Sequence, residues 1–201
     1  MAQADLRSDP RALIWTVGHG TRATESLADL LRAAGVTTVI DVRRYPEGRR
    51  QPHLSRKRLE VDLPRLDLWY EWCGEALGGR RPGPPASATP SPWRSPGFAA
   101  YAAYMLTDVF RGALSALEGR AVAGEALAVM CAETLWWRCH RRLIADALVS
   151  DGFQVRHLIN EPPGVLHRTS TYALTNAGTA SQTGRAAGDG LRLHQAQGSR
   201  R

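Results

Sequence analysis

The sequence Ala128-Val-Met-Cys-Ala-Glu-Thr-Leu-Trp-Trp-Arg-Cys-His-Arg-Arg142 carries the strongest indication of the fold of this protein. It begins within an apolar run, Leu127 to Cys131, that predicts a buried strand. It ends in the first turn of a predicted helix that continues to Leu148. Open α/β sheets commonly place their sites at such a turn from strand to helix, and the free N–H groups of a helix N-terminus favour an anion. The stretch therefore predicts an α/β fold together with the position of a site.

The N-terminal part of the chain predicts a strand, a helix and a second strand. The apolar run from Ala12 to Val17, bounded by Gly18-His19-Gly20, is typical of a buried strand. A helix is expected to begin with Thr24 as its N-cap and to end at Gly35. The run from Val36 to Val42 predicts the second buried strand. Such a succession within ~30 residues is a βαβ unit of a parallel sheet.

The remaining pattern completes a single α/β domain. Further expected elements are a helix over 55–66, a strand over 68–72, a helix over 98–117 and a last strand over 154–159. We expect a mostly parallel sheet flanked by helices, in Rossmann-like layers. The domain is expected to span 12–163, after a flexible N-terminus over 1–11. Residues 164–201, rich in Gly, Ala, Thr, Ser, Gln and Arg, are expected to form a low-complexity, disordered tail.

Composition narrows the class of protein. No apolar run among the 201 residues approaches the ~20 needed to cross a bilayer, and the N-terminus lacks the apolar region of a signal peptide. We therefore expect a cytoplasmic protein. The three cysteines are not typical of a disulfide framework. The net charge of +7 favours a polyanionic partner, nucleic acid first, and thus association with the nucleoid; the alternative is that an arginine-rich genome raises the charge.

Four motifs together resemble a known family. They are Thr16-Val-Gly-His-Gly-Thr21, Asp41-Val-Arg-Arg-Tyr-Pro46, Leu77-Gly-Gly79, and Cys131-Ala-Glu133 followed by Cys139-His-Arg141. In this order they resemble the DUF488 family, a bacterial domain of unknown function, over roughly Ile14 to Ile159. The resemblance implies a link to DNA metabolism, including excision of modified bases in DNA repair. It implies nothing about the tail.

Three polar residues lie at the ends of predicted strands and are candidate catalytic groups. His19 follows the first strand, Asp41 ends the second, and Glu133 follows the strand that ends at Cys131. The carboxyl ends of parallel strands share one edge, so these side chains can converge although they are distant in sequence. Neighbouring carboxylates and arginines shift each other's pKa, which can separate an acid from a base. The alternative is that each carboxylate pairs with an arginine to anchor a loop, and that His19 caps a helix.

Arginines and aromatic residues suggest a surface for nucleic acid. The segment from Arg43 to Arg58 contains seven basic residues and a single acidic residue, Glu47. Guanidinium groups fit phosphate oxygens in pairs of hydrogen bonds. Candidate phosphate-binding residues are Arg43, Arg44, Arg49, Arg50, Arg80, Arg81, Arg138 and Arg141. Tyr45, Trp93 and Trp136 are candidates for stacking on bases, with packing in the core as the alternative for the tryptophans.

Cysteine chemistry is the third possibility. Cys139 and His140 stand at the start of a predicted helix, where a thiol can become nucleophilic; the alternative is a supporting role next to the site, or packing. A zinc site built from Cys131, Cys139 and His140 is conceivable. Their spacing is not Cys-x2-Cys and no second ligand pair follows, so we expect neither a metal nor another cofactor.

These features favour an enzyme acting on DNA. The most specific hypothesis is a DNA glycosylase that hydrolyses the N-glycosidic bond of a modified pyrimidine, for example a 5-hydroxymethylated one. A carboxylate would stabilise the sugar cation or orient water, a histidine or arginine would accept charge on the leaving base, and an aromatic pocket would hold the flipped base. The alternatives are a non-catalytic module that binds DNA, RNA or phosphate, and a thiol-dependent enzyme that uses Cys139. Charge cannot separate catalysis from binding, but the location of Asp41 and Glu133 can, because an enzyme requires a carboxylate that is not fully ion-paired in a concave site.

Overall fold

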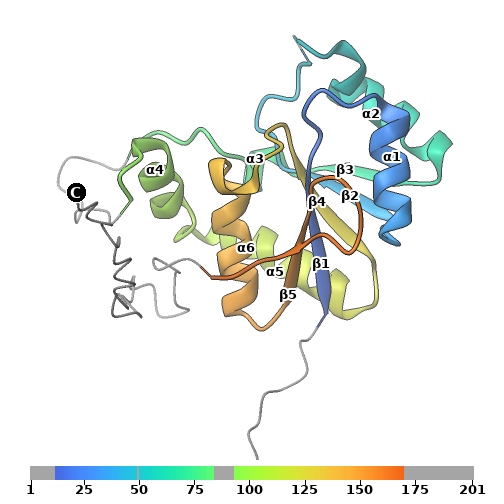
Figure 1. The fold of residues 1–201 in the computed structure, drawn as a ribbon. Helices are drawn as coiled ribbons and strands as arrows, with labels where there is room; N and C mark the ends of the chain where they lie inside the picture. The colour runs from blue at the N-terminus through green and yellow to red at the C-terminus, as the bar shows by residue number, and fades with distance from the viewer. Residues whose placement is uncertain (1–11, 49, 84–92, 170–201) are drawn as a thin grey trace, which may run out of the picture.

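The computed structural model describes residues 12–48, 50–83 and 93–169. These residues form a six-stranded sheet with the strand order β3-β2-β4-β1-β5-β6 (Figure 1). The strands are β1 (Leu13–Gly18), β2 (Thr38–Asp41), β3 (Trp69–Trp72), β4 (Leu127–Cys131), β5 (Gln154–Leu158) and β6 (Val165–Leu166). The first five are parallel to their neighbours, and β6 pairs with β5 in the antiparallel direction. The α/β fold with a mostly parallel sheet is therefore confirmed.

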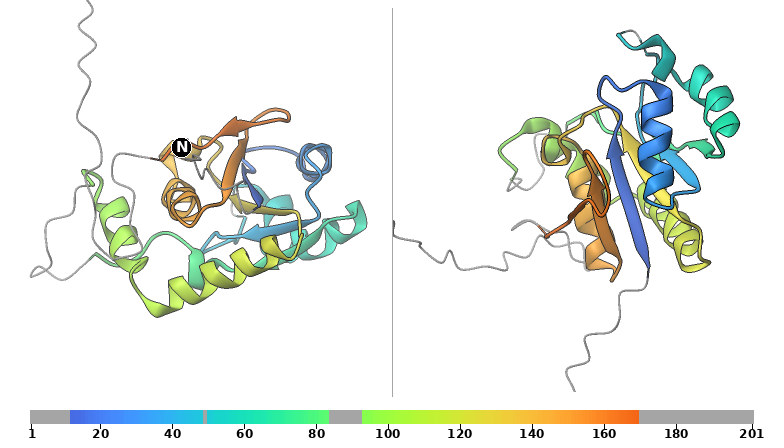
Figure 2. Two further views of the ribbon diagram at one scale, coloured as in Figure 1. Left: turned by 90° about the horizontal axis from the view of Figure 1, so that it is seen from below. Right: turned by 45° about the vertical axis from the view of Figure 1, so that its right-hand side comes forward.

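Helices cover both faces of the sheet. They are α1 (Thr24–Ala33), α2 (Arg56–Asp62), α3 (Gly74–Leu77), α4 (Pro96–Tyr104), α5 (Asp108–Val122) and α6 (Arg141–Ser150), with 3-10 turns η1 (Pro52–Leu54), η2 (Pro64–Leu66) and η3 (Trp136–Arg138). Helices α1 and α6 lie on opposite sides of β1 (Figure 2). One core cluster packs α1 and α2 on the sheet, and a second cluster packs α4, α5 and α6 on its other face.

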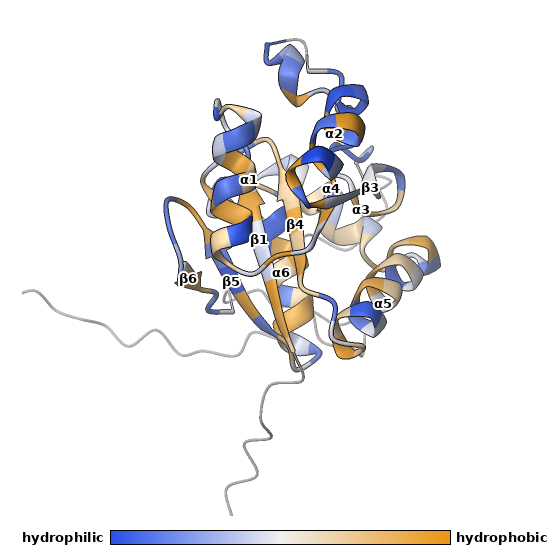
Figure 3. Ribbon diagram, turned by 90° about the vertical axis from the view of Figure 1, so that its right-hand side faces the viewer, coloured by the Kyte–Doolittle hydropathy of each residue, from blue (hydrophilic) through white to orange (hydrophobic). Residues whose placement is uncertain are grey.

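The apolar runs of the sequence become strands that are buried on both faces. Along β1, Ile14 contributes to the cluster with α6, whereas Trp15 and Val17 contribute to the cluster with α1. Along β4, Val129 and Met130 divide between the two clusters in the same way. Since successive side chains of a strand point to opposite faces, a strand covered twice needs apolar residues at every position. Figure 3 shows continuous hydrophobic character along β4, whereas β1 also contains Thr16, a buried polar residue.

Several element boundaries differ from the sequence-based expectations, among them the helix expected over 55–66, which is α2 followed by the 3-10 turn η2. The helix expected over 98–117 is two helices, α4 and α5, because Thr107 caps a new start: its hydroxyl accepts a hydrogen bond from the Phe110 N–H at 3.4 Å. Helix α1 has Ala23, not Thr24, as its N-cap. The Thr24 hydroxyl instead donates to the carbonyl of His53 at 3.4 Å.

The ordered sheet continues past residue 163, the expected end of the domain. Val165 of β6 lies opposite His157 of β5, and His167, one residue beyond β6, is buried. A strand of two residues carries no periodic pattern that sequence analysis could detect. Residues 1–11 and 170–201, expected to be flexible, lie outside the described residues. In the described part of the chain, no helix combines the length and apolar character needed to span a bilayer.

Candidate functional site

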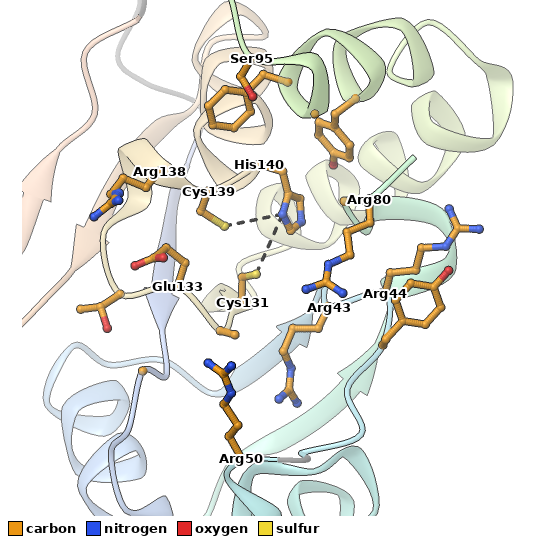
Figure 4. Close-up of a pocket in the computed structure, with 18 of the residues that line it drawn as sticks. Arg43, Arg44, Arg50, Arg80, Ser95, Cys131, Glu133, Arg138, Cys139 and His140 are labelled. Carbon is orange, nitrogen blue, oxygen red and sulfur yellow. Dashed lines mark hydrogen bonds between the residues drawn. The ribbon is translucent and has the colours of Figure 1, made fainter. Parts of the chain in front are cut away.

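A cavity of about 910 Å³ lies at the carboxyl ends of β1, β2 and β4 (Figure 4). The segments that follow these three strands form much of its wall, and residues before and within α4 complete it. Its lining consists of Gly20, Thr21, Arg43, Arg44, Tyr45, Arg50, Gly79, Arg80, Ser95, Gly97, Phe98, Tyr101, Cys131, Ala132, Glu133, Thr134, Arg138, Cys139 and His140. This is the edge at which α/β sheets bind ligands.

The charges around the cavity are strongly unbalanced. Its lining contains five arginines and one carboxylate, Glu133. Arg50, Arg80 and Arg138 are exposed, and they extend from three different segments toward the same space (Figure 4). Such an arrangement of guanidinium groups suits a ligand with several anionic oxygens.

Asp41 lies beneath the cavity in a buried ion pair with Arg43. The guanidinium Nε donates to Asp41 Oδ1 at 2.9 Å, and Nη2 donates to Oδ2. The Tyr70 hydroxyl donates to the same Oδ2 at 2.6 Å. Asp41 is fully buried, so both oxygens are occupied and shielded from a ligand. The environment of Asp41 therefore matches the alternative that it anchors a loop. Of the ion pair, Arg43 lines the cavity and Asp41 does not.

His19 supports the other side of the same guanidinium. Its Nε2 accepts from Arg43 Nη1 at 3.0 Å, and its Nδ1 donates to the carbonyl of Gly20 at 2.9 Å. Burial, followed by the charge of Arg43, lowers the pKa of His19 to about 4. The ring is therefore neutral at physiological pH and positions Arg43. Neither His19 nor Asp41 belongs to the cavity lining, although both lie at the expected edge of the sheet.

Glu133 presents an exposed carboxylate on a loop that is fixed from below. One oxygen, Oε1, accepts from the Leu135 N–H at 3.2 Å. The carbonyl of Glu133 accepts a hydrogen bond from the buried guanidinium of Arg141, which also donates to Thr16 Oγ1 at 3.1 Å. A Cβ added at Gly18 would stand 2.0 Å from the Glu133 carbonyl oxygen. The loop thus packs directly on the end of β1, and the glycine of the Thr16-Val-Gly-His-Gly motif permits this contact.

A buried chain of polar side chains supports the Arg141 anchor, and sequence analysis missed it. Thr16 Oγ1 lies 2.7 Å from His157 Nδ1, His157 Nε2 lies 2.9 Å from His167 Nδ1, and His167 Nε2 lies 3.0 Å from Asp146 Oδ1. Burial, with His167 and Arg141 nearby, lowers the pKa of His157 to about 2. The partners are up to 141 positions apart, and nothing local in the sequence indicates that they meet.

Several predicted binding residues have other contacts. Arg141 is buried and does not line the cavity. Arg81 donates a hydrogen bond to the carbonyl of Gly78 at 2.8 Å, and its guanidinium lies over the Tyr104 ring. Trp136 stacks on the ring of His157, with centroids 4.1 Å apart. Trp93 packs on Phe98.

Among the predicted binding residues, Tyr45 is accessible at the cavity. Tyr45 is 61% exposed and lines the cavity, so it is the predicted stacking residue that a ligand can reach. Arg49 lies outside the described residues.

Two thiols and an imidazole meet in the cavity wall. Cys131 ends β4, and Cys139 and His140 precede α6. His140 Nδ1 lies 4.0 Å from Cys131 Sγ and 3.6 Å from Cys139 Sγ (Figure 4). The neighbouring Cys131 thiol lowers the pKa of Cys139 against the effect of burial, and His140 and Arg141 add to this lowering. Tyr101 and Gly79, which sequence analysis did not assign to the site, contact the His140 ring.

Comparison with known proteins agrees with the motifs. The family model described as "Domain of unknown function DUF488" matches residues 23–148, which is more than half of the chain. The searches of curated proteins and of solved structures found no match. The four motifs lie along the cavity wall or directly beneath it, and the matched range includes three of them. The chain belongs to the DUF488 family.

Proposed function

We propose that this protein is an enzyme acting on nucleic acid, a DNA N-glycosylase that excises a modified pyrimidine such as a 5-hydroxymethylated base. The observation that carries the proposal is Glu133: an exposed carboxylate in the lining of a cavity whose other charged side chains are mainly arginines. A concave site with one carboxylate free of an arginine ion pair, within the described residues, is what catalysis by this route needs.

The cavity dimensions and charge suit a nucleotide turned out of a duplex. Ligand pockets commonly measure ~300–1,000 Å³, and this cavity of about 910 Å³ is at the upper end of that range. Exposed Arg50, Arg80 and Arg138 would bind the phosphates on either side of the flipped nucleotide. The exposed ring of Tyr45 would stack on a base.

Glu133 would act on the sugar or on water. As the bond from C1′ to the base nitrogen breaks, positive charge develops on the sugar and the electron pair leaves with the base. The carboxylate would stabilise that cation, or accept a proton from the water whose oxygen bonds to C1′. Nearby guanidinium groups would stabilise the departing base, which ends with a proton from solvent. Arg43, held by Asp41 and His19, is already oriented toward the cavity and needs no reorganisation.

The first experiment identifies the substrate and then tests Glu133. Purified protein is incubated with duplexes that carry a panel of modified pyrimidines, and abasic sites are revealed by alkaline cleavage. With an active duplex, Glu133→Gln should lower the single-turnover rate by about 10²–10⁴-fold. DNA affinity should stay equal or increase, because a negative charge near phosphates has been removed.

Two matched variants make this result specific. Glu47→Gln removes a negative charge from the arginine-rich loop outside the cavity lining, and it should leave the rate unchanged. Asp41→Asn breaks a buried ion pair and should lower the free energy of unfolding by about 3–5 kcal/mol. Full base release by Glu133→Gln would reject the role of Glu133. Salt-dependent binding without base release from any duplex would indicate a non-catalytic binding module, and loss of activity only in Cys139→Ser would indicate thiol chemistry.

A further inference from the structure

Cys131, Cys139 and His140 are a cluster of metal-ligating side chains that the proposed function does not use. No two of their ligand atoms are more than 4.8 Å apart. In a tetrahedral zinc site with Zn–S near 2.3 Å and Zn–N near 2.0–2.1 Å, a sulfur and a nitrogen are about 3.6 Å apart. The two S–N distances in the protein, 3.6 and 4.0 Å, are close to this separation.

We infer that Cys131, Cys139 and His140 bind a zinc ion, with a fourth coordination position open to the arginine-lined cavity. All three residues belong to the cavity lining, so an ion between them would contact the same space as Glu133. Three protein ligands and one open position are the pattern of a catalytic zinc site, whereas structural sites have four protein ligands. The open position would hold water or an anionic ligand atom.

The imidazole is held so that Nδ1 faces the two sulfurs. A Cβ added at Gly79 would lie 2.9 Å from Nδ1, so the backbone of Gly79 supports one side of the ring. The Tyr101 ring meets the imidazole edge-on, with centroids 5.0 Å apart. His140 Nε2 is buried and has no hydrogen-bond partner among the described residues. Packing therefore orients this ligand, instead of the carboxylate or carbonyl that usually does so.

The donor set selects the class of metal. Two thiolates and an imidazole favour Zn²⁺ over Mg²⁺ and Ca²⁺, which prefer oxygen ligands. This inference departs from the expectation of no metal, which rested on a spacing that is not Cys-x2-Cys. The ligands meet because Cys131 and Cys139 lie on either side of a loop that returns to the sheet. The interaction of that loop with Gly18 and Arg141 brings them together, and it depends on residues far away in the sequence.

The test measures metal binding on the tag-free full-length chain under reducing conditions. Elemental analysis after saturation with Zn²⁺ and gel filtration should give one zinc per chain. Replacement by Co²⁺ should give thiolate-to-cobalt charge-transfer bands in the near ultraviolet and intense visible bands typical of tetrahedral coordination. Addition of azide should change the visible bands, since it would occupy the open position.

Three variants assign the ligands. Cys131→Ser and Cys139→Ser should each weaken zinc binding by more than the 10–100-fold typical of residues that only orient a ligand, with helix content retained by circular dichroism. Cys73→Ser is the matched control, because this third cysteine contacts Glu71 outside the cluster, and it should bind zinc as the wild type does.

Several results would overturn the inference, and none depends on glycosylase activity. Absence of zinc from the reduced wild-type chain, or unchanged affinity in Cys139→Ser, would exclude the site. A Co²⁺ spectrum without thiolate bands would exclude the sulfur ligands. A spectrum that azide leaves unchanged would refute the open position.

Discussion

Arg43 lies between two buried residues, Asp41 and His19, and the open cavity. Its guanidinium donates to the carboxylate, to the His19 ring and to the carbonyl of Leu54 at 2.7 Å. A charge buried in this way needs every donor satisfied, because an unpaired buried charge costs several kcal/mol. The neutral His19 ring supplies an acceptor that a protonated ring could not. The neutral ring of His19 thus adds to the contacts with Asp41 and Leu54 that hold Arg43 in place.

We predict that the free energy of unfolding falls at acid pH because His19 becomes protonated. The pKa of His19 is about 4 in the folded protein, against 6.5 for an unperturbed histidine, so the unfolded chain binds this proton more readily. The contribution of the neutral ring to stability is complete above pH 6.5 and decreases as the pH falls toward 4. Between pH 7 and pH 4 the protonation of His19 should lower the free energy of unfolding by roughly 2–3 kcal/mol.

Urea denaturation of the wild type and of His19→Gln at several pH values measures this contribution. The wild type should lose more stability than the variant between pH 7 and pH 4. Parallel pH dependences of the two proteins would show that His19 titrates normally.

At the scale of elements, the turn after β1 and the loop after β4 form one unit. The Cβ that any other residue would add at Gly18 would stand 2.0 Å from the carbonyl oxygen of Glu133 and 2.6 Å from the Cα of Thr134. These are backbone atoms, which cannot rotate away as a side chain can. The position of Glu133 in the cavity therefore depends on the absence of a side chain at residue 18.

We predict opposite effects of two Gly→Ala substitutions. Gly18→Ala should lower the free energy of unfolding by about 3 kcal/mol or more, because the loop must move or the strand must bend. Gly112→Ala is the matched control: its Cβ would meet nothing within 4 Å on the exposed side of α5. It should raise stability by about 0.5–1 kcal/mol through helix propensity. Chemical denaturation measures both, and a neutral Gly18→Ala would contradict the close packing of the two segments.

Across the whole molecule, the arginines include two sets: some form ion pairs with acidic residues, and others lie around the cavity without an acidic partner among the described residues. On the helical elements, four arginines form ion pairs with acids three or four residues away in sequence: Arg32, Arg56, Arg58 and Arg65. Around the cavity, Arg44, Arg50, Arg80 and Arg138 have no ion pair with an acid among the described residues. The net charge alone does not distinguish these sets, although they should contribute differently to binding a polyanion.

Salt dependence of DNA binding can separate the two sets. Replacing the four cavity arginines by Gln should reduce the slope of log K against log salt by up to about 3–4, because each phosphate contact on duplex DNA contributes ~0.9. The same replacement of the four paired arginines removes equal charge and should change the slope much less. Equal slopes for the two quadruple variants would show that the cavity is not the binding surface.

Residues 164–169 connect the sheet to α6, and we predict that they stabilise the domain. His167 bridges His157 on β5 and Asp146 on α6, so its removal breaks two buried hydrogen bonds. A chain ended after Pro163 should unfold several degrees below a chain ended after Thr169, a difference of about 2–5 kcal/mol. Scanning calorimetry of the two chains isolates residues 164–169. Identical unfolding temperatures would show that β6 and His167 add nothing.

Local patterns in the amino-acid sequence are sufficient to predict the parallel strands of the sheet. The largely apolar runs that contain β1, β2 and β4 identify buried strands, because a strand covered on both faces buries its side chains in both directions. Their parallel order and the edge that carries the site follow from the βαβ pattern. The motif glycines and the residues after each strand could therefore be located, and the DUF488 resemblance was confirmed.

Which polar groups meet depends on how the whole chain packs. Asp41 and Glu133 are both carboxylates after strands, yet Arg43 and Tyr70 surround one of them while the other faces the cavity. Thr16 contacts His157 because two strands 141 positions apart in sequence are adjacent in the sheet, and Cys131 approaches His140 because the loop between them folds back on the end of β1. Hydrophobic periodicity reports the environment of a residue's own segment, whereas a hydrogen bond or a metal site needs a partner whose position depends on the packing of the whole chain.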